Sequence, residues 1–65
     1  MTNALYVVIN GRGHFWHGGK AVEWQTHITD AELYINLEVA KEDARAVGGR
    51  VYEIEYKLKE VITND

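Results

Sequence analysis

A chain of 65 residues that contains no cysteine has few ways to stabilise a fold. A domain of this size buries only about 60% of the surface that its unfolded chain exposes, so its core needs a supplement such as disulfides, a metal or self-association. The absence of cysteine excludes disulfides and thiolate zinc sites and suits a reducing compartment. We therefore expect residues 1–65 to form one small domain that self-associates as a homodimer.

Three apolar segments predict strands. Residues 4–9 (ALYVVI) are β-branched or aromatic, and the following NGRG favours a hairpin turn, because Asn and Gly adopt positive φ angles at low cost. The return strand is predicted over residues 14–17. Residues 21–25 alternate as a third short strand or as an extended segment at the sheet edge.

The last strand has the clearest alternation in the chain. Residues 50–58 alternate apolar with mostly charged side chains, as expected for a strand with one buried face. If it continued through Val61 it would measure roughly 40 Å, about twice the usual length, so its end is expected to project beyond the sheet. Such an overhang offers backbone hydrogen bonds to another chain.

One main helix is expected between these strands. Asn36 is the predicted N-cap, and Gly48 and Gly49 end the helix, one of them in a left-handed conformation. Thr29 and Glu32 match a capping box, which predicts a helical turn over residues 30–34. Apolar residues recur within the helix at three- and four-residue spacing, at Leu37, Ala40, Ala44 and Val47.

The order β-β-(β)-α-β predicts an α+β fold, in which a small antiparallel sheet of three to four strands carries the helix on one face. We expect the helix to cover the more apolar face, which holds Leu5, Val7, Ile9, Tyr52, Ile54 and Tyr56. The other face is then left uncovered and becomes the predicted partner-binding surface. Its candidate residues are Tyr6, Val8, Trp16, Glu53 and Glu55. The alternative is that a few apolar residues on a solvated sheet face have no function.

Three large rings fall within ten residues, at Phe15, Trp16 and Trp24. Rings of this size either fill the core of a small domain or anchor an interface. Because adjacent strand residues face opposite ways, Phe15 and Trp16 cannot both lie in the core, and we place Trp16 on the uncovered face.

The sequence carries no recognisable catalytic or metal-binding pattern. Serine and cysteine are absent, and no remaining nucleophile is paired with a base, so we expect a protein that is not an enzyme. His14 and His17 are three apart in a predicted strand and point to opposite faces, which argues against a shared metal with His27. No cofactor is expected, and the glycines around the hairpin match no phosphate-binding motif.

Charge separates the two halves of the chain. Residues 1–29 hold two basic and one acidic side chain, a net charge of +1, whereas residues 30–65 hold five basic and nine acidic ones, a net charge of −4. Phosphate neutralisation needs clustered Lys and Arg, so nucleic acid is not an expected partner. The acidic side chains either imitate phosphates to attract a nucleic-acid-binding protein or form an ordinary solvated surface.

The first residues carry no positive cluster, and no apolar run approaches the roughly 20 residues that span a bilayer. We therefore expect neither export nor a membrane partner, and a cytoplasmic location.

Two segments carry a resemblance. LYINLEVAKEDARAVGGRVYEI (residues 33–54) resembles the helix-to-strand pattern of short phage and prophage proteins, and YVVINGRGHFW (residues 6–16) is similar to their first hairpin. The two segments hold 33 of the 65 residues, about half of the chain, and the resemblance consists mainly of cap, core and turn positions. It implies a phage protein that binds and modulates a host factor, with inhibition of a bacterial defence system such as a CRISPR effector as one outcome.

The expected function is therefore that of a protein-binding inhibitor or adaptor with a host protein as its partner. Two alternatives stay open. One is a small-ligand sponge or sensor, with Trp16, Trp24 and the histidines lining a pocket between subunits. The other is a structural subunit that assembles through the overhanging last strand.

Overall fold

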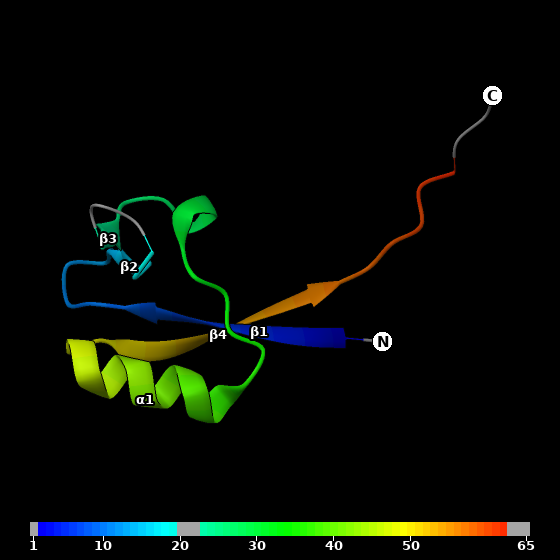
Figure 1. Ribbon diagram of the computed structural model, residues 1–65. Helices are drawn as coiled ribbons and strands as arrows, with labels where there is room; N and C mark the ends of the chain where they lie inside the picture. Colours follow the sequence, from blue (N-terminus) through cyan, green and yellow to red (C-terminus); the bar gives the residue numbers. More distant parts are fainter. Residues whose placement is uncertain (1, 20–22, 63–65) are drawn as a thin grey trace.

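The computed structural model describes residues 2–19 and 23–62 of the protein. It contains one antiparallel sheet with the strand order β3-β2-β1-β4 and one α-helix, which confirms the predicted α+β fold and element order (Figure 1). The predicted residues 21 and 22 of the third strand lie outside the described residues. The elements are β1 (Thr2–Ile9), β2 (Phe15–Trp16), β3 (Trp24–Gln25), the 3-10 helix η1 (Ile28–Asp30), α1 (Leu37–Val47) and β4 (Arg50–Lys57).

The turn between β1 and β2 is organised by Asn10. Its side-chain oxygen accepts hydrogen bonds from the backbone N–H groups of Arg12 at 2.9 Å and His14 at 3.0 Å. Gly13 closes the turn with a φ of 78°, a conformation that a side chain disfavours. The NGRG segment thus forms the predicted hairpin, although β2 is shorter than expected.

The longest pairing in the sheet joins β1 to β4. The two strands are antiparallel in continuous register from Thr2 opposite Lys57 to Ile9 opposite Arg50. This two-stranded ribbon extends past the helix on the side of the chain termini, and residues 58–62 continue away from it (Figure 1). Its projecting half is therefore covered by α1 on neither face.

The segment before the helix differs from the prediction. The 3-10 helix spans Ile28–Asp30, and no side-chain cap hydrogen bond forms at its start, so the predicted turn over residues 30–34 is wrong. Tyr34 instead pairs with Tyr6 as an isolated antiparallel bridge, with an N–H···O bond of 2.8 Å in each direction. Two bonds to β1 hold Tyr34 in extended backbone, which excludes a helical turn there.

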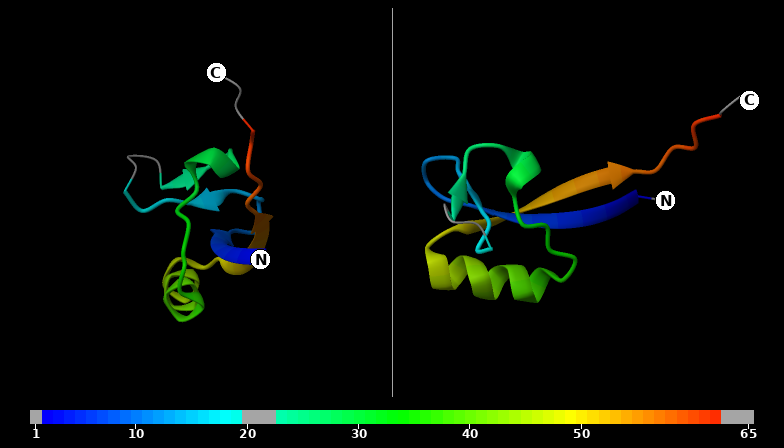
Figure 2. Two further views of the ribbon diagram at one scale, coloured as in Figure 1. Left: turned by 90° about the vertical axis from the view of Figure 1, so that its right-hand side faces the viewer. Right: turned by 45° about the horizontal axis from the view of Figure 1, so that its top comes forward.

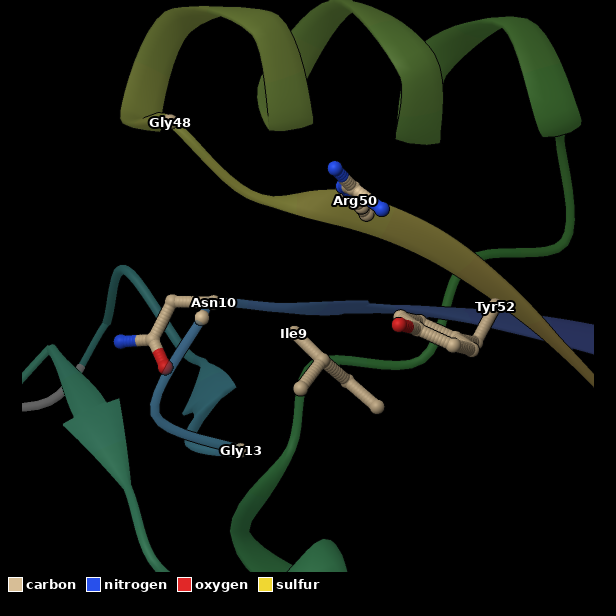
Figure 3. A pocket seen from close by; sticks show the side chains of 7 residues that line it. Ile9, Asn10, Gly13, Gly48, Arg50 and Tyr52 are labelled. Atoms are coloured by element: carbon tan, nitrogen blue, oxygen red, sulfur yellow. The ribbon is translucent and has the colours of Figure 1, made fainter.

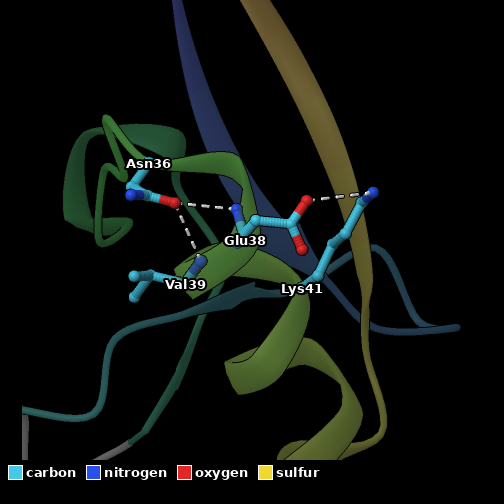
Figure 4. Close-up of polar contacts among 4 residues, drawn as sticks. All are labelled: Asn36, Glu38, Val39 and Lys41. Atoms are coloured by element: carbon cyan, nitrogen blue, oxygen red, sulfur yellow. Dashed lines mark hydrogen bonds and ion pairs between the residues drawn. The ribbon is translucent and has the colours of Figure 1, made fainter.

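The ends of α1 agree with the sequence analysis. The Asn36 side chain accepts from the N–H groups of Glu38 at 2.9 Å and Val39 at 3.2 Å, which is the predicted N-cap (Figure 4). Gly48 ends the helix with a φ of 80°. Nζ of Lys41 lies 3.7 Å from Oε1 of Glu38, which is one turn earlier, and this exposed ion pair contributes little to stability.

No helix in the described ranges is long and apolar enough to cross a membrane.

The core lies on the sheet face that was predicted to be uncovered. Val8 is completely buried and clusters with Tyr34 and with Ala40 and Ala44 of α1. Tyr6 and the other half-buried apolar residues around it complete this core, namely Trp16, Trp24, Val47 and Val51. The assignment of the helix to the face of Leu5, Val7 and Ile9 was therefore wrong.

The close approach of the C-terminal end of α1 to Val8 explains why the helix covers this face of the sheet. Ala40 and Ala44 are small enough to let the helix axis approach Val8, and only two residues separate the end of α1 from the start of β4. A Cβ atom on Gly49 would lie 2.5 Å from Cγ1 of Val8, so only glycine fits here. The short connection places Val51 inward and leaves the guanidinium of Arg50 on the opposite face, away from the apolar core.

Both tryptophans belong to the core. Trp16 and Trp24 are cross-strand partners whose ring centroids lie 5.2 Å apart at an interplanar angle of 63°, an edge-to-face contact. The prediction that Trp16 lies on an uncovered face was wrong, because its ring packs against the buried cluster of Val8, Tyr34 and the alanines of α1.

Tyr34 also joins the linker to the helix through its side chain. Its hydroxyl donates to Oδ2 of Asp43 at 2.7 Å. Burial raises the pKa of the Tyr34 phenol well above its ordinary value of about 10, and the Asp43 hydrogen bond and the nearby Glu32 charge raise it further. A hydrogen bond from Trp16 acts in the opposite direction.

The raised pKa of Tyr34 predicts that the protein loses stability at alkaline pH. The Tyr34→Phe variant should lack this part of the pH dependence. Above pH 10 the Tyr34 phenol loses its proton in the unfolded chain but keeps it in the folded protein. The contribution of Tyr34 to the free energy of unfolding is therefore complete below pH 10 and declines as the pH rises further. At neutral pH we expect Tyr34→Phe to cost about 1 kcal/mol through loss of the hydrogen bond. Urea unfolding of both proteins between pH 8 and 11 checks this; parallel pH profiles would contradict it.

Candidate functional site

The five predicted partner-binding residues are divided between core and surface. Val8 is completely buried, and Tyr6 and Trp16 are half-buried against the core. Glu53 and Glu55 are exposed on β4, on the same face as Val8 but closer to the projecting end of the ribbon. These residues therefore do not form one surface, because α1, Tyr34 and the two tryptophans pack against the apolar part of that face.

The opposite face of β1 and β4 carries a continuous row of apolar side chains, which no helix among the described residues covers. In the left view of Figure 2, α1 and the segment leading into it lie on one side of the β1–β4 ribbon. Tyr52 is 49% exposed and Tyr56 is 38% exposed on the other side, while Val7, directly across from Tyr52, is buried at 1% exposure. We call this surface the tyrosine face; it consists of Leu5, Val7, Ile9, Tyr52, Ile54 and Tyr56.

The register aligns these residues into one patch. Leu5 lies opposite Ile54, and Val7 lies opposite Tyr52, so the apolar positions of the two strands are direct cross-strand neighbours. Half-exposed tyrosines beside aliphatic residues combine large contact area with few rotatable bonds. This composition is typical of the anchoring part of a protein interface.

An open hollow lies at the turn end of the tyrosine face. Its volume is about 760 Å³, and Ile9, Arg50 and Tyr52 line it together with glycines of the hairpin turn and the helix end. Figure 3 shows the side chains of Ile9 and Tyr52 on the side of the strands away from the helix. Arg50 supplies the only charge among the lining residues.

The outer edge of β4 is a second feature of this surface. Tyr6 uses its own N–H and C=O groups to bond Tyr34, so its pair with Glu53 across the ribbon is not hydrogen-bonded. The backbone groups of Glu53 therefore point away from β1, and alternation gives Val51 and Glu55 the same direction. Among the described residues, no strand pairs with this edge.

The described residues hold no cluster of potential metal ligands beside these features. In the described part of the chain, no three histidine or acidic side chains lie close enough to hold a metal ion. Nδ1 of His17 accepts a hydrogen bond from the backbone of Gly19 at 3.2 Å. The features that stand out among the described residues are thus the apolar tyrosine face and the outer edge of β4.

One signal in the sequence identifies the tyrosine face as the exposed one. Arg50 lies on the same face of β4 as Tyr52 and Ile54, because it lies an even number of positions before each of them. Burying that face against the helix end would therefore bury a guanidinium beside the turn. Small residues at Ala40 and Ala44 likewise match the close packing against Val8. The apolar character of β1 on both faces hides this signal, because Val7 and Val8 are equally suited to a core.

Comparisons with known proteins identify no relative. No family model matches the chain, and neither a curated protein nor a solved structure matches it significantly.

Proposed function

We propose that this protein is a non-enzymatic protein-binding domain that contacts its partner through the tyrosine face and the outer edge of β4. The observation that carries the proposal is the half-exposed tyrosine pair, Tyr52 and Tyr56, on a sheet face without a covering helix. Self-association as a homodimer is part of the same proposal, since a 65-residue domain gains stability by covering such a face.

The specific role we propose is modulation or inhibition of a host defence protein, in the manner of short phage proteins. The support for this role is the resemblance of residues 6–16 and 33–54 to the hairpin and the helix-to-strand pattern of such proteins. Glu53 and Glu55 border the binding surface at the β4 edge, where their charges favour a partner with a basic rim. No catalysis is assigned to the chain.

Affinity capture from bacterial lysate with matched variants tests this proposal. We expect wild-type protein to retain one partner in a stoichiometric amount and Tyr52→Lys to lose it, because a charge would be buried in the apolar contact. Ile35→Lys is the control, since Ile35 is 85% exposed outside the tyrosine face and receives the same charge. Equal capture by both variants would exclude the tyrosine face as the contact surface.

A second candidate function is small-ligand binding at the hollow beside Arg50. Its volume falls in the range of small-molecule sites, and its single guanidinium would select an anionic ligand. Trp16 and Trp24 take no part in this site, because they pack within the core of one chain. Recovery of the bait without any protein partner would favour this candidate.

A further inference from the structure

The outer edge of β4 has a sequence that is complementary to itself. Its N–H and C=O groups, which pair with no strand among the described residues, belong to the odd-numbered residues Val51, Glu53 and Glu55. The chain continues beyond the strand with further charged and apolar residues. An open edge of this kind readily accepts an additional strand. The order of charged side chains along the β4 edge determines which additional strand can pair with it in a favourable register.

We propose that two copies of the chain pair antiparallel through their β4 edges, about a two-fold axis at Tyr56, and form one continuous sheet. This inference rests on the self-association included in the proposed function and specifies its interface. Pairing in this register extends β4 from Lys57 through Val61, so residues 58–61 become the projecting strand that a second copy covers.

Backbone geometry limits the possible registers to those centred on a residue. The N–H and C=O groups that point away from β1 belong to odd-numbered residues of β4, and they must face the same groups of the second copy. Odd-numbered residues therefore pair with odd-numbered residues. Both copies then present the same sheet face on the same side. The tyrosine faces of the two copies are therefore continuous.

Charge disfavours three of the neighbouring registers. An axis at Ile54 would oppose Glu53 to the second Glu55, and an axis at Glu55 would oppose that residue to itself. An axis at Lys57 would likewise oppose two lysines. Like charges directly across a pair of strands are destabilising, so these three registers are disfavoured.

The axis at Tyr56 places no like charges across from each other. It places Glu53 across from Lys59 and the Glu55 position across from the Lys57 position, and symmetry repeats both pairs. The backbone groups of these positions point toward the second copy, so each pair also exchanges two main-chain hydrogen bonds. The alignment favoured by charge is therefore also one that backbone hydrogen bonding allows.

The apolar positions also match in this register. On the tyrosine face, Ile54 lies across from Leu58, which is 79% exposed in the single chain, and Tyr56 lies across from its own copy. On the other face Val51 lies across from Val61. Pairing therefore covers apolar side chains beyond the end of β4 that the monomer leaves in water.

The helix leaves room for this arrangement. α1 lies along the turn half of the β1–β4 ribbon, whereas the proposed pairing is centred on the half that projects toward the termini (Figure 1). The two helices of the dimer would lie on the same face at opposite ends of the joined sheet.

Light scattering during gel filtration tests this inference through a charge exchange. We expect wild-type protein to elute at twice the chain mass of 7.4 kDa. Lys59→Glu, which opposes two glutamates at each symmetric contact, should raise the dimer dissociation constant at least about tenfold. Combining it with Glu53→Lys should restore the dimer, and Lys41→Glu on α1, with the same charge change, should leave it intact.

Two results would overturn the inference. A wild-type protein that is monomeric over a wide concentration range would exclude the self-pairing but leave capture of a host protein through the tyrosine face intact. A dimer that resists Lys59→Glu, or that the double exchange fails to restore, would exclude this register. Loss of capture by Tyr52→Lys with an intact charge-sensitive dimer would instead support both proposals.

Discussion

Gly49→Ala is expected to lower the free energy of unfolding by about 2–3 kcal/mol, because the added methyl group would overlap Cγ1 of Val8. The same group would lie 3.3 Å from the carbonyl oxygen of Ile9 and 3.4 Å from the Trp24 ring, so it cannot turn into free space. A domain of 65 residues has a total stability of roughly 3–10 kcal/mol. The substitution therefore removes a large part of it.

Gly48 and Gly11 serve as controls that distinguish the effect of close packing from that of backbone conformation. A Cβ on Gly48 meets nothing within 4 Å, but its φ of +80° is unfavourable for alanine, so Gly48→Ala should cost about 1 kcal/mol. Gly11 has neither constraint, and Gly11→Ala should be close to neutral. Chemical unfolding of the three variants should rank Gly49 first.

A double-mutant cycle identifies the contact itself. If Val8 causes the overlap, Gly49→Ala should cost at least 1 kcal/mol less in a Val8→Ala background than in wild type. Additive effects would contradict the assignment of Val8 to the helix-covered core.

Trp24→Ala is expected to cost about 3 kcal/mol, at the lower end of the range for large aromatic residues because Trp24 is half-buried. The ring packs edge-to-face on Trp16 and closes the core near Gly49. Its removal would leave Trp16 without its aromatic partner and open the core to water. Thermal unfolding by circular dichroism measures the effect.

Ile35→Ala is the matched control for this prediction. Ile35 is an apolar residue of the linker before α1 that is almost fully exposed, so its truncation should change stability by less than about 0.5 kcal/mol. Similar melting temperatures for Trp24→Ala and wild type would remove the tryptophan pair from the core.

The architecture was predictable where local chemistry determines the backbone. Asn36 and Gly48 fix the ends of α1 through hydrogen bonds and conformation that their side chains dictate. Asn10 and Gly13 likewise fix the first hairpin turn, and the alternation over β4 fixes its strand character. These signals act within a few residues and need no knowledge of tertiary contacts.

The buried face of the sheet was not predictable by counting apolar residues. Tyr52, Ile54 and Tyr56 form the more apolar side of β4, yet that side stays open. The close fit of Val8 against Gly49 and the alanines of α1 determines the buried side, and such a fit depends on shape. The same reversal moved Trp16 and Val8 into the core and left only Glu53 and Glu55 exposed among the predicted binding residues.

Tyr34 shows a second limit of local reasoning. Its neighbours Thr29 and Glu32 match a capping box, but its backbone bonds to Tyr6 hold it in extended conformation. Tertiary pairing with β1 outweighs the local preference for a helical turn.

Site-specific photo-crosslinking tests the central claim, that the tyrosine face contacts the partner, most directly. A photoreactive phenylalanine analogue at Tyr52 is compared with the same group at Glu42, an exposed position on α1. We expect crosslinks to a partner protein or to a second copy from position 52 and none from position 42. Crosslinks from the helix position alone would place the contact on the other side of the molecule and contradict the proposed binding surface.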